Sequence, residues 1–143
     1  MKFYIATDHA GVLIKEDVKN ILKDMEHEVT DLGTNSTERV DYPDFAHKLS
    51  ENVLKDKGSF GILICGTGIG MSLAANKHKG IRAALCHDAY TAQMARAHND
   101  ANVLCFGQRV VGLGVIESMI KAWCETEFEG GRHENRVKKI EIE

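Results

Sequence analysis

Short apolar runs alternate along the chain with longer segments in which apolar residues recur at helical spacing. The runs are rich in β-branched and aromatic residues, which favour extended backbone. They predict five strands, at residues 2–7, 28–32, 60–65, 81–86 and 102–106. Helical spacing predicts helices at residues 12–25, 43–56, 70–77, 88–97, 113–128 and 132–140.

The alternation of strands and helices, joined by short connections, predicts an α/β fold. Strands that are separated by helices pair in parallel, and the helices then cover both faces of the sheet. We therefore expect a five-stranded parallel sheet in a single domain that comprises residues 1–143. The C-terminal segment of this domain, residues 128–143, contains the Gly130-Gly131 break. It carries two arginines, Arg132 and Arg136.

Polar residues follow the predicted strands at the edge where such sheets bind ligands. Ligands of open parallel sheets lie outside the carboxyl ends of the strands. The residues that come directly after the strands are Asp8 and His9, Cys65, His87 and Asp88, and Gly107 and Arg109. We expect these groups to converge on one cleft.

Composition and charge narrow the classes of function. The net charge of −3 offers no electrostatic case for a nucleic-acid partner. No apolar run has the length of a membrane span, and Asp8 interrupts the first run too early for a signal peptide. The four cysteines include no CxxC pair, which favours reduced thiols in a cytoplasmic protein over a disulfide scaffold or a zinc site.

The segment Cys65-Gly66-Thr67-Gly68-Ile69-Gly70 joins a buried strand to a helix. Its glycines allow close backbone approach, and its free N–H groups favour an anion. Met71 stands where a dinucleotide-binding loop needs its last glycine, and no Gly-Lys-Ser/Thr follows, so a small anion or oxyanion suits the loop better than a nucleotide. Cys65 is either a buried small hydrophobe or, as a thiolate before a helix, a base or nucleophile.

Cationic and aromatic residues supply candidate anion and sugar contacts. Arg132 and Arg136 are four residues apart and share a helix face, either as a solvated basic turn or as a phosphate clamp. Arg109 is a candidate third member of that clamp. Tyr42 lies at a helix entry and is a candidate for closing a sugar pocket. His98 precedes the fifth strand, so it lies toward the end of the sheet opposite the cleft. Either the loop folds over to bring it to the cleft, or His98 serves the cleft of a neighbouring subunit.

Motifs along nearly the whole chain resemble those of the ribose/galactose isomerase family. They are Asp8-His9-Ala10-Gly11, Asp31-Leu32-Gly33-Thr34, Asp41-Tyr42-Pro43, Ile64 to Gly70, Ala74 to Lys77, Gly80 to Ala83, His98-Asn99-Asp100, Phe106 to Gly112 and Phe128 to His133. The resemblance implies a Rossmann-like α/β/α sandwich. It also implies an active site at a homodimer interface, while pairing of dimers into tetramers stays open.

The resemblance further implies a role for each matching residue. Cys65 is expected to move a proton between C1 and C2 of a sugar phosphate, and His98 is expected to open the sugar ring. The remaining roles are ring contacts for Asp8 and Tyr42, binding of enediolate oxygens by Thr67, Asn99 and the backbone of Gly66, Gly68, Ile69 and Gly70, and phosphate binding by His9, Arg109, Arg132 and Arg136. No metal or organic cofactor is implied.

The expected substrate pair is D-ribose 5-phosphate and D-ribulose 5-phosphate. Within the family, one galactose-6-phosphate subunit type lacks the loop cysteine and the other lacks the histidine before asparagine. This chain has both Cys65 and His98, which favours a self-sufficient pentose-phosphate isomerase. A hexose 6-phosphate, such as allose or galactose 6-phosphate, is the alternative substrate.

Overall fold

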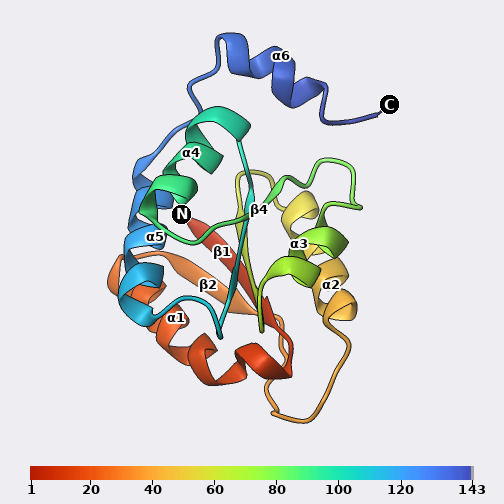
Figure 1. The fold of residues 1–143 in the computed structure, drawn as a ribbon, viewed down its shortest axis with the longest axis vertical. Coiled ribbons are helices and arrows are strands. Elements are labelled where there is room, and N and C mark those ends of the chain that lie inside the picture. Colours follow the sequence, from red (N-terminus) through yellow and green to blue (C-terminus); the bar gives the residue numbers. More distant parts are fainter. Residues whose placement is uncertain (143) are drawn as a thin grey trace.

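The computed structural model describes residues 1–142, and only Glu143 of the expected domain lies outside the described residues. Its five strands form one parallel sheet in the order β2-β1-β3-β5-β4 (Figure 1). The strands are β1 (Lys2–Thr7), β2 (Glu28–Asp31), β3 (Phe60–Cys65), β4 (Ala83–Leu85) and β5 (Val103–Gly107). The expected five-stranded parallel α/β fold is confirmed.

Helices cover both faces of this sheet. They are η1 (His9–Gly11), α1 (Val12–Asp24), α2 (Tyr42–Lys55), α3 (Ile69–Ala75), α4 (Ala89–Asn99), α5 (Leu113–Glu125) and α6 (Arg132–Lys138). Figure 1 shows α2 and α3 on one side, with α1, α4 and α5 on the other. Within the described residues, no helix is long and apolar enough to cross a membrane.

Alternate residues of each strand enter two separate cores. Phe3 and Ile5 of β1 pack with α1 and α5, whereas Tyr4 and Ala6 pack with α2 and α3. Side chains of a strand point alternately to the two faces, and a sheet covered on both faces buries both sets. The near-continuous apolar runs of β1, β3 and β5 follow from this double coverage.

The chain path places a binding edge between β1 and β3. From β1 the chain leads to β2 on one side, and it then crosses to β3 on the other side. The loops that follow β1 and β3 therefore diverge and leave a crevice at their carboxyl ends. Asp8 and Cys65, the first residue after β1 and the last of β3, lie at this crevice.

Several predicted elements are shorter in the structure, among them the last helix, which ends at Lys138 instead of residue 140, and two differ by three residues. The fourth strand comprises Ala83–Leu85 instead of residues 81–86, because Gly80 has a φ of +91° and the N–H of Ile81 closes a turn onto His78. Helix α5 ends at Glu125 instead of residue 128, and its last turn is capped where the Thr126 hydroxyl donates to the carbonyl of Ala122.

Candidate active site

A cleft of about 420 Å³ lies at the carboxyl ends of β1 and β3, beside the loop after β5. Its lining residues are Asp8, Tyr42, Cys65, Gly66, Thr67, Ile69, Gly70, Leu73 and Arg109. The predicted convergence is thus confirmed for the loops after the first, third and fifth strands. It is wrong for His87 and Asp88, because Asp88 caps α4 with a hydrogen bond from the N–H of Thr91 and neither residue lines the cleft.

Cys65 ends β3 at the floor of the cleft, where the residue is 5% exposed. The N–H of Gly68 donates to its Sγ at 3.1 Å. Gly68 has a φ of +80°, a conformation that favours glycine, so the loop can turn back onto the sulfur. This hydrogen bond fixes the sulfur at the floor of the cleft, beside the backbone of the glycine loop.

The other three thiols have surroundings that oppose ionisation. Burial raises the pKa of Cys86 and of Cys124 to about 11 each. Burial raises the pKa of Cys105 further above its ordinary value. Cys65 is therefore the one cysteine of this chain that combines a place in the cleft with a hydrogen bond to its sulfur.

The glycine loop presents donors beside this sulfur. The N–H of Ile69 donates to Thr67 Oγ1 at 3.2 Å, which leaves the hydroxyl hydrogen of Thr67 free for a ligand oxygen. The loop rests directly on β5, since a Cβ at Gly107 would lie 2.5 Å from Thr67 Cα. This close backbone contact holds the donors in place.

Asp8 lines the cleft at the end of β1, whereas His9, the next residue, begins η1 and does not line it. Asp8 is 6% exposed, and its Oδ1 accepts the N–H of Ala10 at 2.9 Å. His9 Nδ1 accepts the N–H of Val40 at 3.2 Å, so the neutral ring carries its proton on Nε2 as a donor. The other carboxylate oxygen of Asp8 is thereby available to a ligand in the cleft, while His9 lies directly beside it in the chain.

Tyr42 and Arg109 form walls of the cleft, and each packs against a glycine. A Cβ at Gly70 would lie 2.5 Å from the ring of Tyr42, and a Cβ at Gly66 would lie 2.8 Å from Nη1 of Arg109. Only glycine at positions 66 and 70 therefore allows the two side chains to approach the loop this closely. This contact accounts for two of the three alternating glycines.

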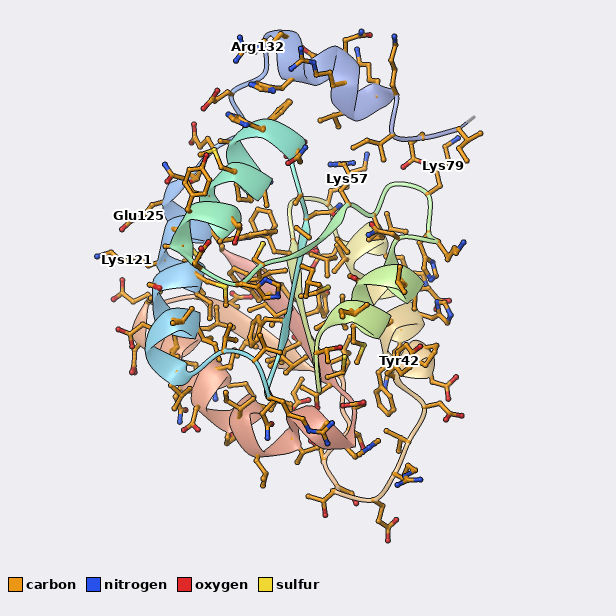
Figure 2. The ribbon with its side chains drawn as sticks, viewed as in Figure 1. Tyr42, Lys57, Lys79, Lys121, Glu125 and Arg132 are labelled. Carbon is orange, nitrogen blue, oxygen red and sulfur yellow. The ribbon has the colours of Figure 1, made fainter. Side chains whose placement is uncertain are left out.

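Four predicted site residues lie at the opposite end of the same chain. His98 and Asn99 form the last turn of α4, and Arg132 and Arg136 lie on α6. Figure 1 shows α6 standing beyond the end of α4, away from the carboxyl ends of the strands, and Figure 2 shows Tyr42 and Arg132 far apart. One chain therefore does not bring these residues into the cleft, nor does it join Arg109 to the other two arginines.

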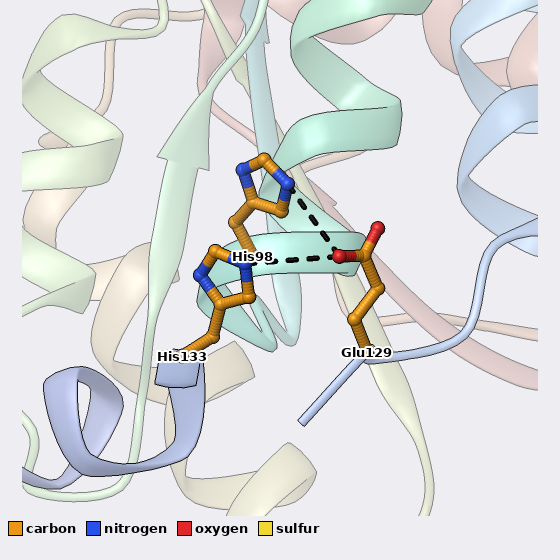
Figure 3. A group of neighbouring side chains, drawn as sticks. All are labelled: His98, Glu129 and His133. Carbon is orange, nitrogen blue, oxygen red and sulfur yellow. Dashed lines mark ion pairs between the residues drawn. The ribbon is translucent and has the colours of Figure 1, made fainter. Parts of the chain in front are cut away.

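A cluster of His98, Glu129 and His133 was not anticipated from the sequence (Figure 3). Glu129 Oε1 lies 3.8 Å from His98 Nε2 and 3.7 Å from His133 Nε2. The two imidazole rings are stacked, with centroids 4.2 Å apart and planes 11° from parallel. The spacing of Glu129 and His133, four residues apart, was the available signal.

This cluster has the donor atoms of a zinc site, but its ring geometry does not fit one. The three ligand atoms lie within 4.8 Å of one another. A metal ion lies in the plane of each imidazole that binds it, because the nitrogen lone pair lies in that plane. The planes of two stacked, nearly parallel rings do not meet at one ion. The observed arrangement is therefore that of an imidazole pair beside a carboxylate.

Comparison with known proteins shows the family of this chain. The family described as Ribose/Galactose Isomerase matches residues 3–140. The chain belongs to the ribose/galactose isomerase family. The resemblance that the motifs indicated is thereby confirmed, and the family match extends from β1 through α6.

Relatives within the family match over almost their whole length. A putative sugar phosphate isomerase of Bacillus subtilis is 48% identical over 141 residues, which are 98% of this chain and 95% of the relative. Ribose-5-phosphate isomerase B of Escherichia coli is 47% identical over 139 residues, 97% of this chain and 93% of the relative.

Solved structures of family members superpose closely on this one. Ribose-5-phosphate isomerase B of Clostridium thermocellum has a TM-score of 0.95 at 50% identity, with 98% of this chain and 95% of that chain covered. The type B ribose 5-phosphate isomerase of Trypanosoma brucei has a TM-score of 0.94 at 47% identity, with 97% and 95% covered.

Proposed function

We propose that this protein interconverts D-ribose 5-phosphate and D-ribulose 5-phosphate. The observation that carries the proposal is the Cys65 sulfur, which accepts the Gly68 N–H at 3.1 Å on the floor of a cleft lined by Thr67 and the loop backbone. A base beside a set of oxyanion donors is what proton transfer next to a carbonyl requires. Relatives named ribose-5-phosphate isomerase B support the pentose substrate.

The proton transfer passes through a cis-enediolate. The Cys65 thiolate takes the proton from C2 of the open aldose, the C1–C2 double bond forms, and negative charge develops on O1. Thr67 and the amides of the loop stabilise that charge. The proton on O2 then moves to O1, and the thiol returns its proton to C1, which gives the ketose without loss of any atom.

The phosphate and the sugar ring are bound by residues at the cleft together with residues at the opposite end of the chain. His9 offers its Nε2–H and Arg109 its guanidinium at the cleft, and Arg132 and Arg136 supply two further forks for phosphate oxygens. Asn99 assists at the enediolate oxygens. Tyr42 lies over the sugar.

We infer that the active site is completed by a second copy of the chain. His98, Asn99 and the α6 arginines lie at the end of the molecule opposite Cys65. Apolar side chains surround the cleft, with Ile69 50% and Leu73 64% exposed, and a partner that covers them removes this surface from water. Both observations are satisfied by a homodimer in which the cleft of each chain faces the His98 and α6 end of the other chain.

The cellular setting follows from the same chemistry. All four cysteines are free, which suits the reducing cytoplasm. Interconversion of an aldose and a ketose 5-phosphate belongs to the pentose phosphate pathway. We place the enzyme there.

A substrate panel tests this proposal. Purified protein is assayed, in the presence of a chelator, with ribose 5-phosphate, allose 6-phosphate and galactose 6-phosphate. Rapid conversion of ribose 5-phosphate, unaffected by the chelator, is the expected result. Activity on a six-carbon substrate alone would move the substrate to the hexose alternative, and no activity on any of them would refute the proposal.

A further inference from the structure

Glu129 is held beside His98 by its own backbone. The N–H of Glu129 donates to the carbonyl of Ala97 at 2.9 Å, so the segment that leads to α6 is attached to the last turn of α4. This hydrogen bond fixes the carboxylate next to the residue that follows Ala97, namely His98. Its Oε1 then lies almost equally far from both imidazole Nε2 atoms, at 3.8 and 3.7 Å.

The His133 ring packs against one face of the His98 ring. It is the buried residue of α6, with its side chain 10% exposed, whereas the His98 side chain is 38% exposed. The near-parallel stack of the two rings restricts rotation of the more exposed ring. His98 is thereby constrained by a ring on one face and a carboxylate at its edge (Figure 3).

The charges around this pair favour a single proton. Two imidazolium rings in a stack repel each other, so protonation of one opposes protonation of the other. Burial, followed by the nearby His98, Arg132 and Arg136, lowers the pKa of His133, and Glu129 acts in the opposite direction with a smaller effect than His98. Protonation of His133 is therefore disfavoured, which keeps a second positive charge away from the His98 ring on which it packs.

We propose that Glu129 and His133 are positioning residues that orient the His98 imidazole for opening of the sugar ring. This inference rests on the proposed function, in which His98 acts on the furanose form of the substrate. Neither residue is assigned a contact with substrate. They act through His98, as a carboxylate and a packed neighbour orient an imidazole in other acid–base sites.

The ring-opening step balances as follows for a furanose hemiacetal. The bond between C1 and the ring oxygen breaks, its electron pair goes to the ring oxygen, and that oxygen takes the proton of His98. The hydroxyl on C1 gives its proton to a carboxylate, for which Asp8 is the candidate, and C1 becomes the aldehyde carbon. No oxidant or reductant enters the step.

The experiment separates ring opening from the later proton transfer. Conversion of ribose 5-phosphate requires both steps, whereas exchange of solvent deuterium into C1 of ribulose 5-phosphate, an open-chain sugar, requires only the transfer by Cys65. Glu129→Gln and His133→Phe are compared with wild type and with Glu134→Gln, a matched change at a carboxylate that pairs with Lys138 instead of with a histidine.

The expected result is a selective defect. Conversion of ribose 5-phosphate by Glu129→Gln and His133→Phe falls about tenfold, a part of the usual contribution of a general acid, while deuterium exchange stays within about twofold of wild type. The Glu134→Gln control behaves as wild type in both measurements.

Two other outcomes overturn the inference. Equal loss of conversion and exchange would mean that Glu129 and His133 only support the fold, and unchanged conversion would mean that they do not act on His98. A wild-type protein that neither converts ribose 5-phosphate nor exchanges deuterium would instead refute the proposed function, so the two failures are distinguishable.

Discussion

Substitution of Gly107 by alanine tests whether the active-site loop packs directly on the end of β5. A Cβ at this position would lie 2.5 Å from Thr67 Cα and 2.6 Å from the carbonyl oxygen of Gly66, where ordinary contact begins at 3.4 Å. Both atoms are backbone, so neither can rotate away. The φ of Gly107 is outside the left-handed region, and the effect therefore comes from lack of space alone.

The expected cost is large for one methyl group. Overpacking of this kind costs about 1–3 kcal/mol, and contact with backbone on both sides places this variant near about 3 kcal/mol. For a chain of this length that corresponds to a fall in melting temperature of about 10 °C. Turnover of ribose 5-phosphate also falls, because the displaced loop carries the donors that surround Cys65.

Gly66→Ala is the matched control. Its Cβ would meet Nη1 of Arg109 at 2.8 Å, and the end of a flexible side chain can move aside. We expect a melting temperature close to wild type and a raised KM for the sugar phosphate. Differential scanning calorimetry and steady-state kinetics measure both variants. A Gly107→Ala protein with wild-type melting temperature and turnover would refute the proposed packing of loop on strand.

Three further perturbations report on other parts of the structure. Arg136→Ala raises KM for ribose 5-phosphate more than it lowers kcat in steady-state kinetics; an unchanged KM would return this arginine to a solvated role. Iodoacetamide at mildly alkaline pH alkylates Cys65 before the other three thiols, as mass spectrometry of the peptides reports. Burial acts to raise the pKa of Asp31, but hydrogen bonds from the Gly33 N–H and Lys15 outweigh it and hold that pKa below its ordinary value. Its contribution to stability is therefore present above the unfolded-state pKa and lost as pH falls through the folded one, so Asp31→Asn is less stable at neutral pH and flattens the acid limb of a urea-denaturation series.

The fold was predictable because local pattern and global topology agree. The apolar run at residues 60–65 ends at Cys65 in the structure as it does in the pattern, and Pro43 and Asp88 stand at the starts of α2 and α4 as expected. The fourth strand was overestimated because apolar character does not report hydrogen bonding: Ile81 and Cys86 are buried, yet both lie outside the strand.

The candidate site was predictable only where it follows the sheet. Asp8, Cys65 and Arg109 meet because each lies at or just beyond the carboxyl end of a strand, and these strands end at the same edge. The stack of His98 on His133 depends instead on where α6 lies against α4, which the local sequence does not encode. Leu73 was missed for a similar reason, since an exposed apolar residue on α3 gains significance only from the cleft beside it.

The central claim is an isomerase site that two chains complete, and subunit complementation tests it most directly. Cys65→Ala and His98→Asn each remove one half of every site, so each homodimer is expected to be nearly inactive on ribose 5-phosphate. When the two variants are co-expressed, about half of the dimers are mixed and each has one intact site, so about a quarter of the wild-type rate returns. A mixture that stays inactive, although mass spectrometry shows mixed dimers, would contradict the account.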